Sequence, residues 1–245
     1  MVDPNTPLYR YVSADRFIEM ALSQKLALIN PSCWNDSYER YWLELLKTQT
    51  GKVLLEDYVK RNGFNPEADA EKILKLCQFQ YVRSFCLCFS SLKDEEVLWS
   101  SKADSNKCVM FETTAGKLME LFPDDVDCTI KPVQYDLESN TIDGFLSKFH
   151  FFQDGVVSHS DVDELLLHKR KCFEYEKEIR LIITPNPIPE KKVIKYPIPN
   201  LSRLINGVMV HPLATPEHVG LIEVICNSLK IPFDGKSQIY DFKLL

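Results

Sequence analysis

Three short polar clusters in the sequence carry side chains suited to chemistry on a charged substrate. The first places Arg10 between two tyrosines, and a guanidinium forms strong, charge-assisted hydrogen bonds with phosphate or carboxylate groups. The second is the pair Ser90-Ser91, which follows an apolar run directly. In the third, every second residue from 174 to 178 is a glutamate, and Arg180 follows. A carboxylate placed in this way can stabilise a positive charge that develops on a substrate.

Each cluster also has an explanation that involves no substrate. Arg10 fits a surface residue or an ion-pair partner, and Ser90-Ser91 fits an ordinary turn. The acidic segment fits the solvated end of a helix. If it is extended instead, its three glutamates share one strand face with Arg180 and repel one another unless cations offset them. The sequence leaves these alternatives open.

Glycine spacing and net charge exclude several common kinds of site. The chain has 245 residues and only 8 glycines, no two of them within three positions of each other. A Walker-type phosphate loop and a G-x-G-x-x-G dinucleotide turn both need closer glycines, so a nucleotide would have to bind in another geometry. The net charge of -6 disfavours a broad basic surface for nucleic acid, although a local contact is compatible with it.

The eight cysteines do not form a metal-binding pattern. No C-x-x-C pair occurs, and Cys86 and Cys88 are two apart within an apolar run, so as strand residues they would point to one face. Structural zinc needs a second pair of ligands at comparable spacing. We therefore expect no metal, and we expect the thiols to be reduced and to pack as small hydrophobic groups.

Composition and patterning indicate the fold class. Hydrophobic residues make up 45% of the chain and charged residues 26%, as in ordinary globular proteins. Apolar runs are far shorter than the ~20 residues of a membrane span, and no secretory signal is visible, so we expect a cytoplasmic protein without a membrane partner. Predicted strands and helices interleave irregularly, which favours one α+β domain over residues 1–245, with flanking helices and a mixed or antiparallel sheet. The expected elements include strands at 8–12, 85–89, 179–183 and 239–242, and helices at 161–172 and 215–229.

The same polar clusters resemble a bacterial protein family, the one called domain of unknown function 2971. The resemblance covers about residues 8 to 211 and rests on segments that follow one another in the family's order. These are residues 8–11, 35–39, 88–90, 98–100, 108–111 and 175–181. The last, Tyr-Glu-Lys-Glu-Ile-Arg-Leu, is the most specific. The family's name implies no activity.

A more distant resemblance does imply one. A strand-end arginine, a Phe-Ser-Ser strand end and a later Glu-x-Glu occur in this order in ADP-ribosyltransferases, including those of the DNA-targeting toxin type. The resemblance implies a split sheet whose cleft takes NAD as co-substrate. It implies Glu176 or Glu178 as the catalytic carboxylate, with Glu178 preferred because it adjoins the strand. It also implies contacts to NAD from Arg10 at a phosphate or ribose, from Ser90 in the cleft wall, and from Tyr11 or Tyr38 against a ring.

Three functions follow as hypotheses. The first is an NAD-dependent ADP-ribosyltransferase, as a bacterial toxin or phage-defence effector, whose acceptor is an unidentified protein or nucleic acid. It requires Arg10, Ser90 and one of the two glutamates to line a single cleft. The second is a non-catalytic binding or sensing module, in which each carboxylate is paired with a cation and no cleft exists. The third is a metal-dependent nuclease or hydrolase, which requires Asp36 and Glu176 within metal-bridging reach and uses Glu39 as a further carboxylate.

Overall fold

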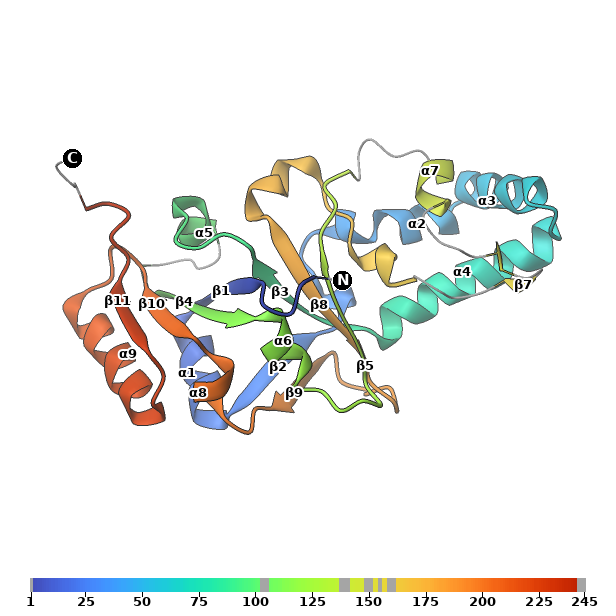
Figure 1. The fold of residues 1–245 in the computed structure, drawn as a ribbon. Coiled ribbons are helices and arrows are strands. Elements are labelled where there is room, and N and C mark those ends of the chain that lie inside the picture. Colours follow the sequence, from blue (N-terminus) through green and yellow to red (C-terminus); the bar gives the residue numbers. More distant parts are fainter. Residues whose placement is uncertain are drawn as a thin grey trace.

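The protein is seen here in a computed structural model that describes residues 2–101, 106–136, 142–147, 152–153, 156–157 and 162–241. Within these residues, a mixed nine-stranded sheet is surrounded by helices, and one further pair of short strands lies apart from it (Figure 1). The expected α+β class, with a mixed sheet and flanking helices, is confirmed.

The strands of the large sheet are β1 (Pro7–Ser13), β2 (Lys25–Ile29), β3 (Phe85–Ser90), β4 (Cys108–Thr114), β5 (Asp127–Pro132), β8 (Glu178–Thr184), β9 (Val193–Pro197), β10 (Gly207–Val210) and β11 (Phe233–Lys236). The separate pair is β6 (Phe152–Gln153) and β7 (Val156–Val157). The α-helices are α1 (Ala14–Ser23), α2 (Tyr41–Lys47), α3 (Gln49–Arg61), α4 (Pro66–Arg83), α5 (Glu96–Ser101), α6 (Ala115–Met119), α7 (Ile142–Leu146), α8 (Leu201–Leu204) and α9 (Pro216–Leu229). Short 3-10 helices are η1 (Pro31–Cys33), η2 (Ser37–Arg40), η3 (Val162–Leu166) and η4 (Lys171–Glu176).

The sheet branches at β3. Along one edge β3 pairs antiparallel with β8 over its whole length, and β5 continues the sheet beyond β8. The other edge of β3 is shared by two strands. There β1 pairs only through Tyr9 with Ser90, and β2 pairs only through Ile29 with Cys86. Because β1 and β2 leave this edge at opposite ends of β3, the sheet is split between them.

Side-chain caps define the starts of α3, α4 and α9. Asn65 accepts a hydrogen bond from the Ala68 amide at the start of α4, where Pro66 occupies the first helical position. Thr215 and Pro216 begin α9 in the same way. Both are standard helix starts, because the cap satisfies one free amide and proline has none to satisfy. These signals are local, which is why the predicted helix at 215–229 agrees with α9.

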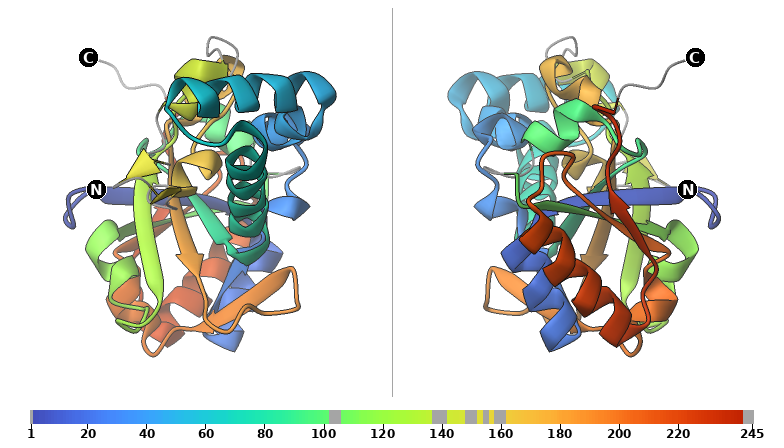
Figure 2. Two further views of the ribbon diagram at one scale, coloured as in Figure 1. Left: turned by 90° about the vertical axis from the view of Figure 1, so that its right-hand side faces the viewer. Right: turned by 90° about the vertical axis from the view of Figure 1, so that its left-hand side faces the viewer.

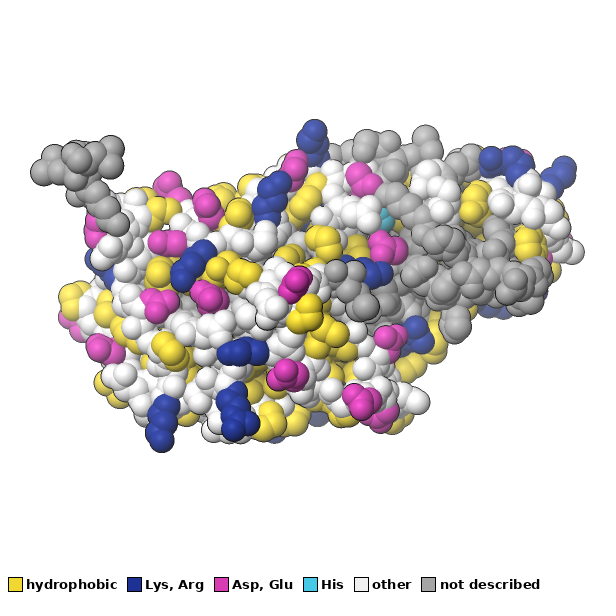
Figure 3. All heavy atoms as spheres, viewed as in Figure 1, with side chains coloured by type: hydrophobic (Ala, Val, Ile, Leu, Met, Phe, Trp, Pro, Cys, Tyr) yellow, Lys and Arg dark blue, Asp and Glu magenta, His cyan; other side chains and the backbone are white. Residues whose placement is uncertain are grey.

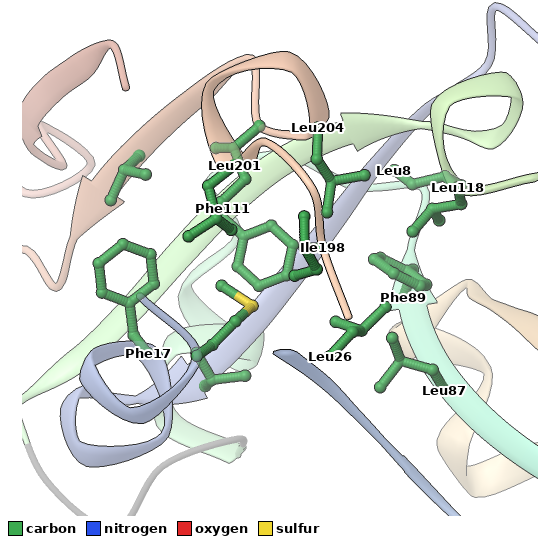
Figure 4. Packing of buried hydrophobic residues seen from close by; sticks show 14 of the residues in the cluster. Leu8, Phe17, Leu26, Leu87, Phe89, Phe111, Leu118, Ile198, Leu201 and Leu204 are labelled. Carbon is green, nitrogen blue, oxygen red and sulfur yellow. The ribbon is translucent and has the colours of Figure 1, made fainter. Parts of the chain in front are cut away.

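Three clusters of buried hydrophobic residues hold the elements together. The first lies between the sheet and α1, α6, α8 and α9, and Phe17, Phe89 and Phe111 are among its members (Figure 4). In Figure 2, α1 and α9 lie side by side on this face. The second fills the helical lobe of α2, α3, α4 and α7, and it includes Cys86 and Ile182 of the sheet. The third packs α5 against Tyr9 and Tyr11 of β1.

Two expected elements are wrong. Residues 162–172 do not form one α-helix. They contain η3, a bridge at His168 to Gln134, and the start of η4, while residue 161 lies outside the described residues. Residues 239–241 are not a strand, and residue 242 lies outside the described residues. The strand is β11, which was missed because Asp234-Gly235 is typical of a turn. Gly235 has a φ of 84°, and β11 is stabilised by parallel pairing with β10.

Candidate functional site

A single row of residues across three strands brings the polar clusters together. Tyr9 of β1 lies opposite Ser90 of β3, and Ser90 lies opposite Glu178 of β8. Residues opposite one another in antiparallel strands are close neighbours on one face of a sheet. The middle of β1, the end of β3 and the start of β8 therefore meet, although almost 170 positions separate Tyr9 from Glu178.

A small pocket of about 60 Å³ opens at this row. Its wall contains five of the six residues singled out in the sequence, which are Arg10, Tyr11, Ser90, Glu176 and Glu178. The remaining lining residues are Tyr9, Cys88, Phe89 and Leu98. The pocket volume corresponds to about two water molecules, since one water takes about 30 Å³ in the liquid, so the pocket by itself does not enclose a ring or a sugar.

The acidic segment is neither a continuous strand nor a solvated helix end. Residues up to Glu176 form the 3-10 helix η4, Lys177 then takes a left-handed conformation with φ of 40°, and β8 begins at Glu178. Neither of the two alternatives considered for this segment, one strand face or a solvated helix end, is therefore correct. Glu174 lies on the surface and pairs with Lys177, whereas the carboxylates of Glu176 and Glu178 are buried.

A buried lysine holds these two carboxylates. The ammonium nitrogen of Lys169 lies 2.7 Å from Oε2 of Glu176 and 2.9 Å from Oε2 of Glu178. Sequence reasoning missed Lys169, which lies seven and nine positions before its partners in a segment expected to be helical. The only signal available was that the acidic run requires cations close by.

A second buried cation continues the network. Arg180 donates through Nε to Oε1 of Glu178 at 2.6 Å, and through Nη2 it pairs with Glu39 of η2. Burial alone would raise the pKa of the Glu178 carboxyl, but Arg180 and Lys169 together hold that pKa well below its ordinary value. Glu178 is therefore ionised at neutral pH.

Ser90 connects the end of β3 to the turn between η4 and β8 through hydrogen bonds. Its hydroxyl donates to the carbonyl of Glu176 at 2.7 Å and accepts from the amide of Leu92 at 3.1 Å. The serine thus fixes the loop that carries both glutamates, and at the same time it lines the pocket.

Arg10 lies where the sheet splits. Its guanidinium donates to the carbonyl of Cys88 and lies 5.9 Å from the ring centre of Phe89. Burial lowers the pKa of Arg10 to about 10, so that the side chain is still a cation at neutral pH. Arg10 also forms part of a second cavity of about 250 Å³ on the α1 side of the split.

This second cavity is cationic. Its described lining residues include Arg10, Arg16, Lys25 and Lys195, against one carboxylate, Glu19, which pairs with Lys195. Among the residues that the structure describes, the first three of these cations have no ion-pair partner. The remaining wall is mostly apolar. The cavity can accept an anion with an apolar part.

The two tyrosines expected at a ligand ring are placed differently. Tyr11 lines the pocket, but its hydroxyl is bonded to the backbone of Leu92 and Glu95, and its ring packs edge-on against Trp99 at 4.9 Å. Tyr38 is half exposed and lies outside the pocket wall, where the guanidinium of Arg170 covers its ring at 4.3 Å.

The carboxylates expected of a metal-dependent enzyme are paired with cations. Asp36 lies 3.2 Å from Arg170, and Glu176 and Glu39 are bound by Lys169 and Arg180. Within the described part of the chain, no group of three or more His, Cys, Asp or Glu side chains is arranged to hold a metal ion.

All eight cysteines are free thiols. Burial raises the pKa of five of them to about 12, which are Cys77, Cys88, Cys108, Cys128 and Cys226.

The visible surface has mixed charge. On the face drawn in Figure 3, the Lys and Arg side chains of the described residues are interspersed with Asp and Glu side chains. In the described part of the chain, no helix combines the length and the apolar character needed to span a bilayer.

Among known proteins, solved structures show a distant similarity in chain path. No family model and no curated protein matches the chain, so the resemblance to domain of unknown function 2971 stays a prediction. Solved structures of DarT from Thermus sp. 2.9 are similar in chain path. The structure in complex with ADP-ribosylated ssDNA has a TM-score of 0.39 and 9% identity, covering 95% of both chains. The structures with NAD+ and carba-NAD+ have the same TM-score, with 9% and 10% identity, over 95% of this chain and 96% and 95% of theirs. A likeness at this level carries no argument about function.

Proposed function

We propose that this protein is an NAD-dependent ADP-ribosyltransferase whose reaction takes place at the pocket between Arg10, Ser90 and Glu178. The observation that carries the proposal is the common pocket itself. It gathers a half-buried cation, a strand-end serine and two buried carboxylates from three separate parts of the chain. This is the arrangement that the transferase hypothesis required.

The state of Glu178 suits such a reaction. When the bond between nicotinamide and ribose breaks, the bonding electrons leave with nicotinamide, and positive charge develops on the ribose carbon. The transition state resembles that of glycoside cleavage. A carboxylate that is already ionised and held rigidly can stabilise this charge without reorganising. Arg180 and Lys169 keep Glu178 in that form, and each carboxylate oxygen can accept a further hydrogen bond.

The cationic cavity can bind the part of NAD that the pocket at Glu178 does not hold. The pocket at Glu178 is too small for a dinucleotide, but Arg10 belongs to both the pocket and the larger cavity. A pyrophosphate carries two negative charges, and Arg10, Arg16 and Lys25 supply cations that form no ion pair with a carboxylate of the described residues. The residues therefore fit NAD with its phosphates at the split and its reacting ribose toward Glu178.

The acceptor would be a protein or a nucleic acid, and the role as a toxin or phage-defence effector stays a prediction.

A second candidate is supported by a different observation. Glu39, Glu176 and Glu178 are each paired with Lys169 or Arg180, as the hypothesis of a non-catalytic binding module required. That hypothesis also required that no cleft exist, whereas two cavities are present and Arg10 lines both of them. The module therefore ranks second.

Nicotinamide release from NAD by the purified protein tests the proposal. The assay is run with water alone, with a single-stranded oligonucleotide and with a protein mixture as acceptors. Glu178→Gln keeps the shape but removes the charge, and we expect it to lower turnover at least about 100-fold. Glu174→Gln is the matched control, because Glu174 belongs to the same acidic run but pairs at the surface with Lys177.

Binding separates the remaining outcomes. Millimolar NAD should raise the melting temperature of the wild-type protein, since a ligand that binds only the folded state stabilises it. Stabilisation without turnover under any acceptor would favour the binding module. Neither turnover nor stabilisation would overturn the assignment of NAD.

A further inference from the structure

We infer that Lys169 is a positioning residue of the pocket, whose ammonium group holds Glu176 and Glu178 side by side for the reaction. The inference rests on the proposed function, because it concerns the same two carboxylates. Nothing in the sequence motifs singles out Lys169, and its role is visible only in the tertiary contacts.

The contacts of Lys169 are short and buried. Its Nζ donates to Oε2 of both glutamates, at 2.7 and 2.9 Å, and the three residues are between 4 and 6% exposed. The backbone amide of Lys169 donates to the carbonyl of Gln134 at 2.9 Å, which anchors the segment. The centre of the Phe173 ring lies 4.7 Å from Nζ of Lys169.

The electrostatics of the pair give this lysine its importance. Two carboxylates that share a buried site repel, and without a cation one of them would take up a proton. Arg180 donates to Oε1 of Glu178, whereas Lys169 occupies Oε2, the oxygen on the Glu176 side of the network. One ammonium group therefore satisfies both carboxylates at once and sets their separation.

Charged and titratable groups from several elements, including its own strand β8, surround Glu178. Its backbone amide donates to the hydroxyl of Tyr135 at 2.7 Å. The charged and titratable groups around it are Arg10 of β1, Glu39 of η2, Cys88 of β3, Tyr135, Lys169, Glu176 of η4 and Arg180 of β8. Of the two cations that form ion pairs with Glu178, Lys169 is the one that also binds Glu176.

Replacing Lys169 by methionine should therefore move the pH dependence of the reaction. In a plot of kcat for nicotinamide release against pH, the decline on the acid side (the acid limb) should move up by about one pH unit or more. The reason is that an opposite charge within 4–6 Å lowers a carboxyl pKa by about 1–3 units, and the methionine removes that charge. At pH 7 kcat should fall, while KM for NAD should change less than about threefold, since Lys169 does not line the cationic cavity. A lysine that served only to stabilise the fold would lower the amount of active protein and leave the acid limb in place.

Three further variants make the test decisive. Lys169→Arg keeps the charge and should leave the acid limb near that of the wild type. Lys169→Met combined with Glu176→Gln removes the repulsion and should return the acid limb toward the wild-type position, even if the single methionine variant does not fold. Lys131→Met is the control, because Lys131 forms a comparable partly buried pair with Glu164 at 2.7 Å outside the pocket wall.

The outcomes separate this inference from the proposed function. If the wild-type protein releases no nicotinamide, the proposed function fails and this inference fails with it. If the wild type is active and Lys169→Met has an unchanged acid limb, the proposed function stands and the positioning role of Lys169 is overturned. A shifted limb that Lys169→Arg restores supports both.

Discussion

The hydroxyl of Ser90 donates a 2.7 Å hydrogen bond to the backbone carbonyl of Glu176, which lies 86 positions later in the chain. The contact joins the end of β3 to the turn that carries the two buried carboxylates. It explains how a loop without glycine holds a left-handed residue, Lys177, next to a strand. The same oxygen accepts from the amide of Leu92, so a single hydroxyl anchors both chain segments.

Ser90→Ala should destabilise the protein by about 1–3 kcal/mol, because it leaves a buried carbonyl and an amide without their partner. The free energy of unfolding in urea measures this loss. Ser91→Ala is the matched control. Ser91 donates to the carbonyl of Lys177 at 3.3 Å and is exposed, so its removal should cost less than about 0.5 kcal/mol. Equal losses in the two variants would mean that Ser90 has no special role.

Asn30→Asp should destabilise the protein strongly at neutral pH. The buried side-chain amide of Asn30 donates to the carbonyls of Tyr81, Val82 and Ser84 at the end of α4, and a carboxylate would face these oxygens instead. We expect a loss of roughly 3 kcal/mol or more, as for other unpaired buried charges.

The pH dependence of that variant has a definite sign. Burial against carbonyl oxygens raises the pKa of the new carboxyl in the folded state, so the stability of the variant is greatest at low pH and is lost as the pH rises through that pKa. Urea unfolding at about pH 4 and pH 7 measures the difference. Asn200→Asp is the control, because Asn200 accepts from the amides of Ser202 and Arg203, which a carboxylate does equally well.

The wild-type protein should lose stability in acid partly through Glu178. The folded-state pKa of Glu178 is held well below the ordinary value of 4.5, so its contribution is present above about pH 4.5 and is lost as the pH falls toward the folded-state value. Urea midpoints between about pH 7 and pH 3 should fall more steeply for the wild type than for Glu178→Gln. Glu71→Gln, which removes an exposed pair with Lys75, should follow the wild-type curve. A Glu178→Gln curve parallel to that of the wild type would contradict the prediction.

Two glycine-to-alanine changes within helices should have opposite effects. A Cβ at Gly51 in α3 would lie 1.9 Å from the carbonyl oxygen of Leu45, so Gly51→Ala should destabilise by about 1–3 kcal/mol or more. A Cβ at Gly220 in α9 would meet nothing within 4 Å. Because alanine favours a helix over glycine by about 1 kcal/mol, Gly220→Ala should raise the melting temperature. A rise for both variants would show that α2 and α3 do not pack as closely as described.

Local patterns in the sequence were enough to predict much of the fold. Apolar runs bounded by turn residues located β3 and β8, and a Thr-Pro start located α9, because hydrophobic burial and helix capping act over a few neighbouring residues. The same patterns placed Ser90 at the end of a strand, as observed, whereas Arg10 lies in the middle of β1 and Glu176 lies in η4. The exceptions were elements whose stability comes from distant partners, such as β11, whose pairing with β10 overrides the turn tendency of Asp-Gly.

The sequence by itself therefore determined the α+β class, several of the strands and helices, and the residue types available for chemistry. Only the tertiary structure decided that the row from Tyr9 through Ser90 to Glu178 forms one pocket wall, that Tyr38 lies outside it, and that Lys169 binds both carboxylates. The physical reason is that these contacts are ion pairs and strand registers between segments far apart in sequence. Their energy depends on shared burial, which no local pattern of residues records.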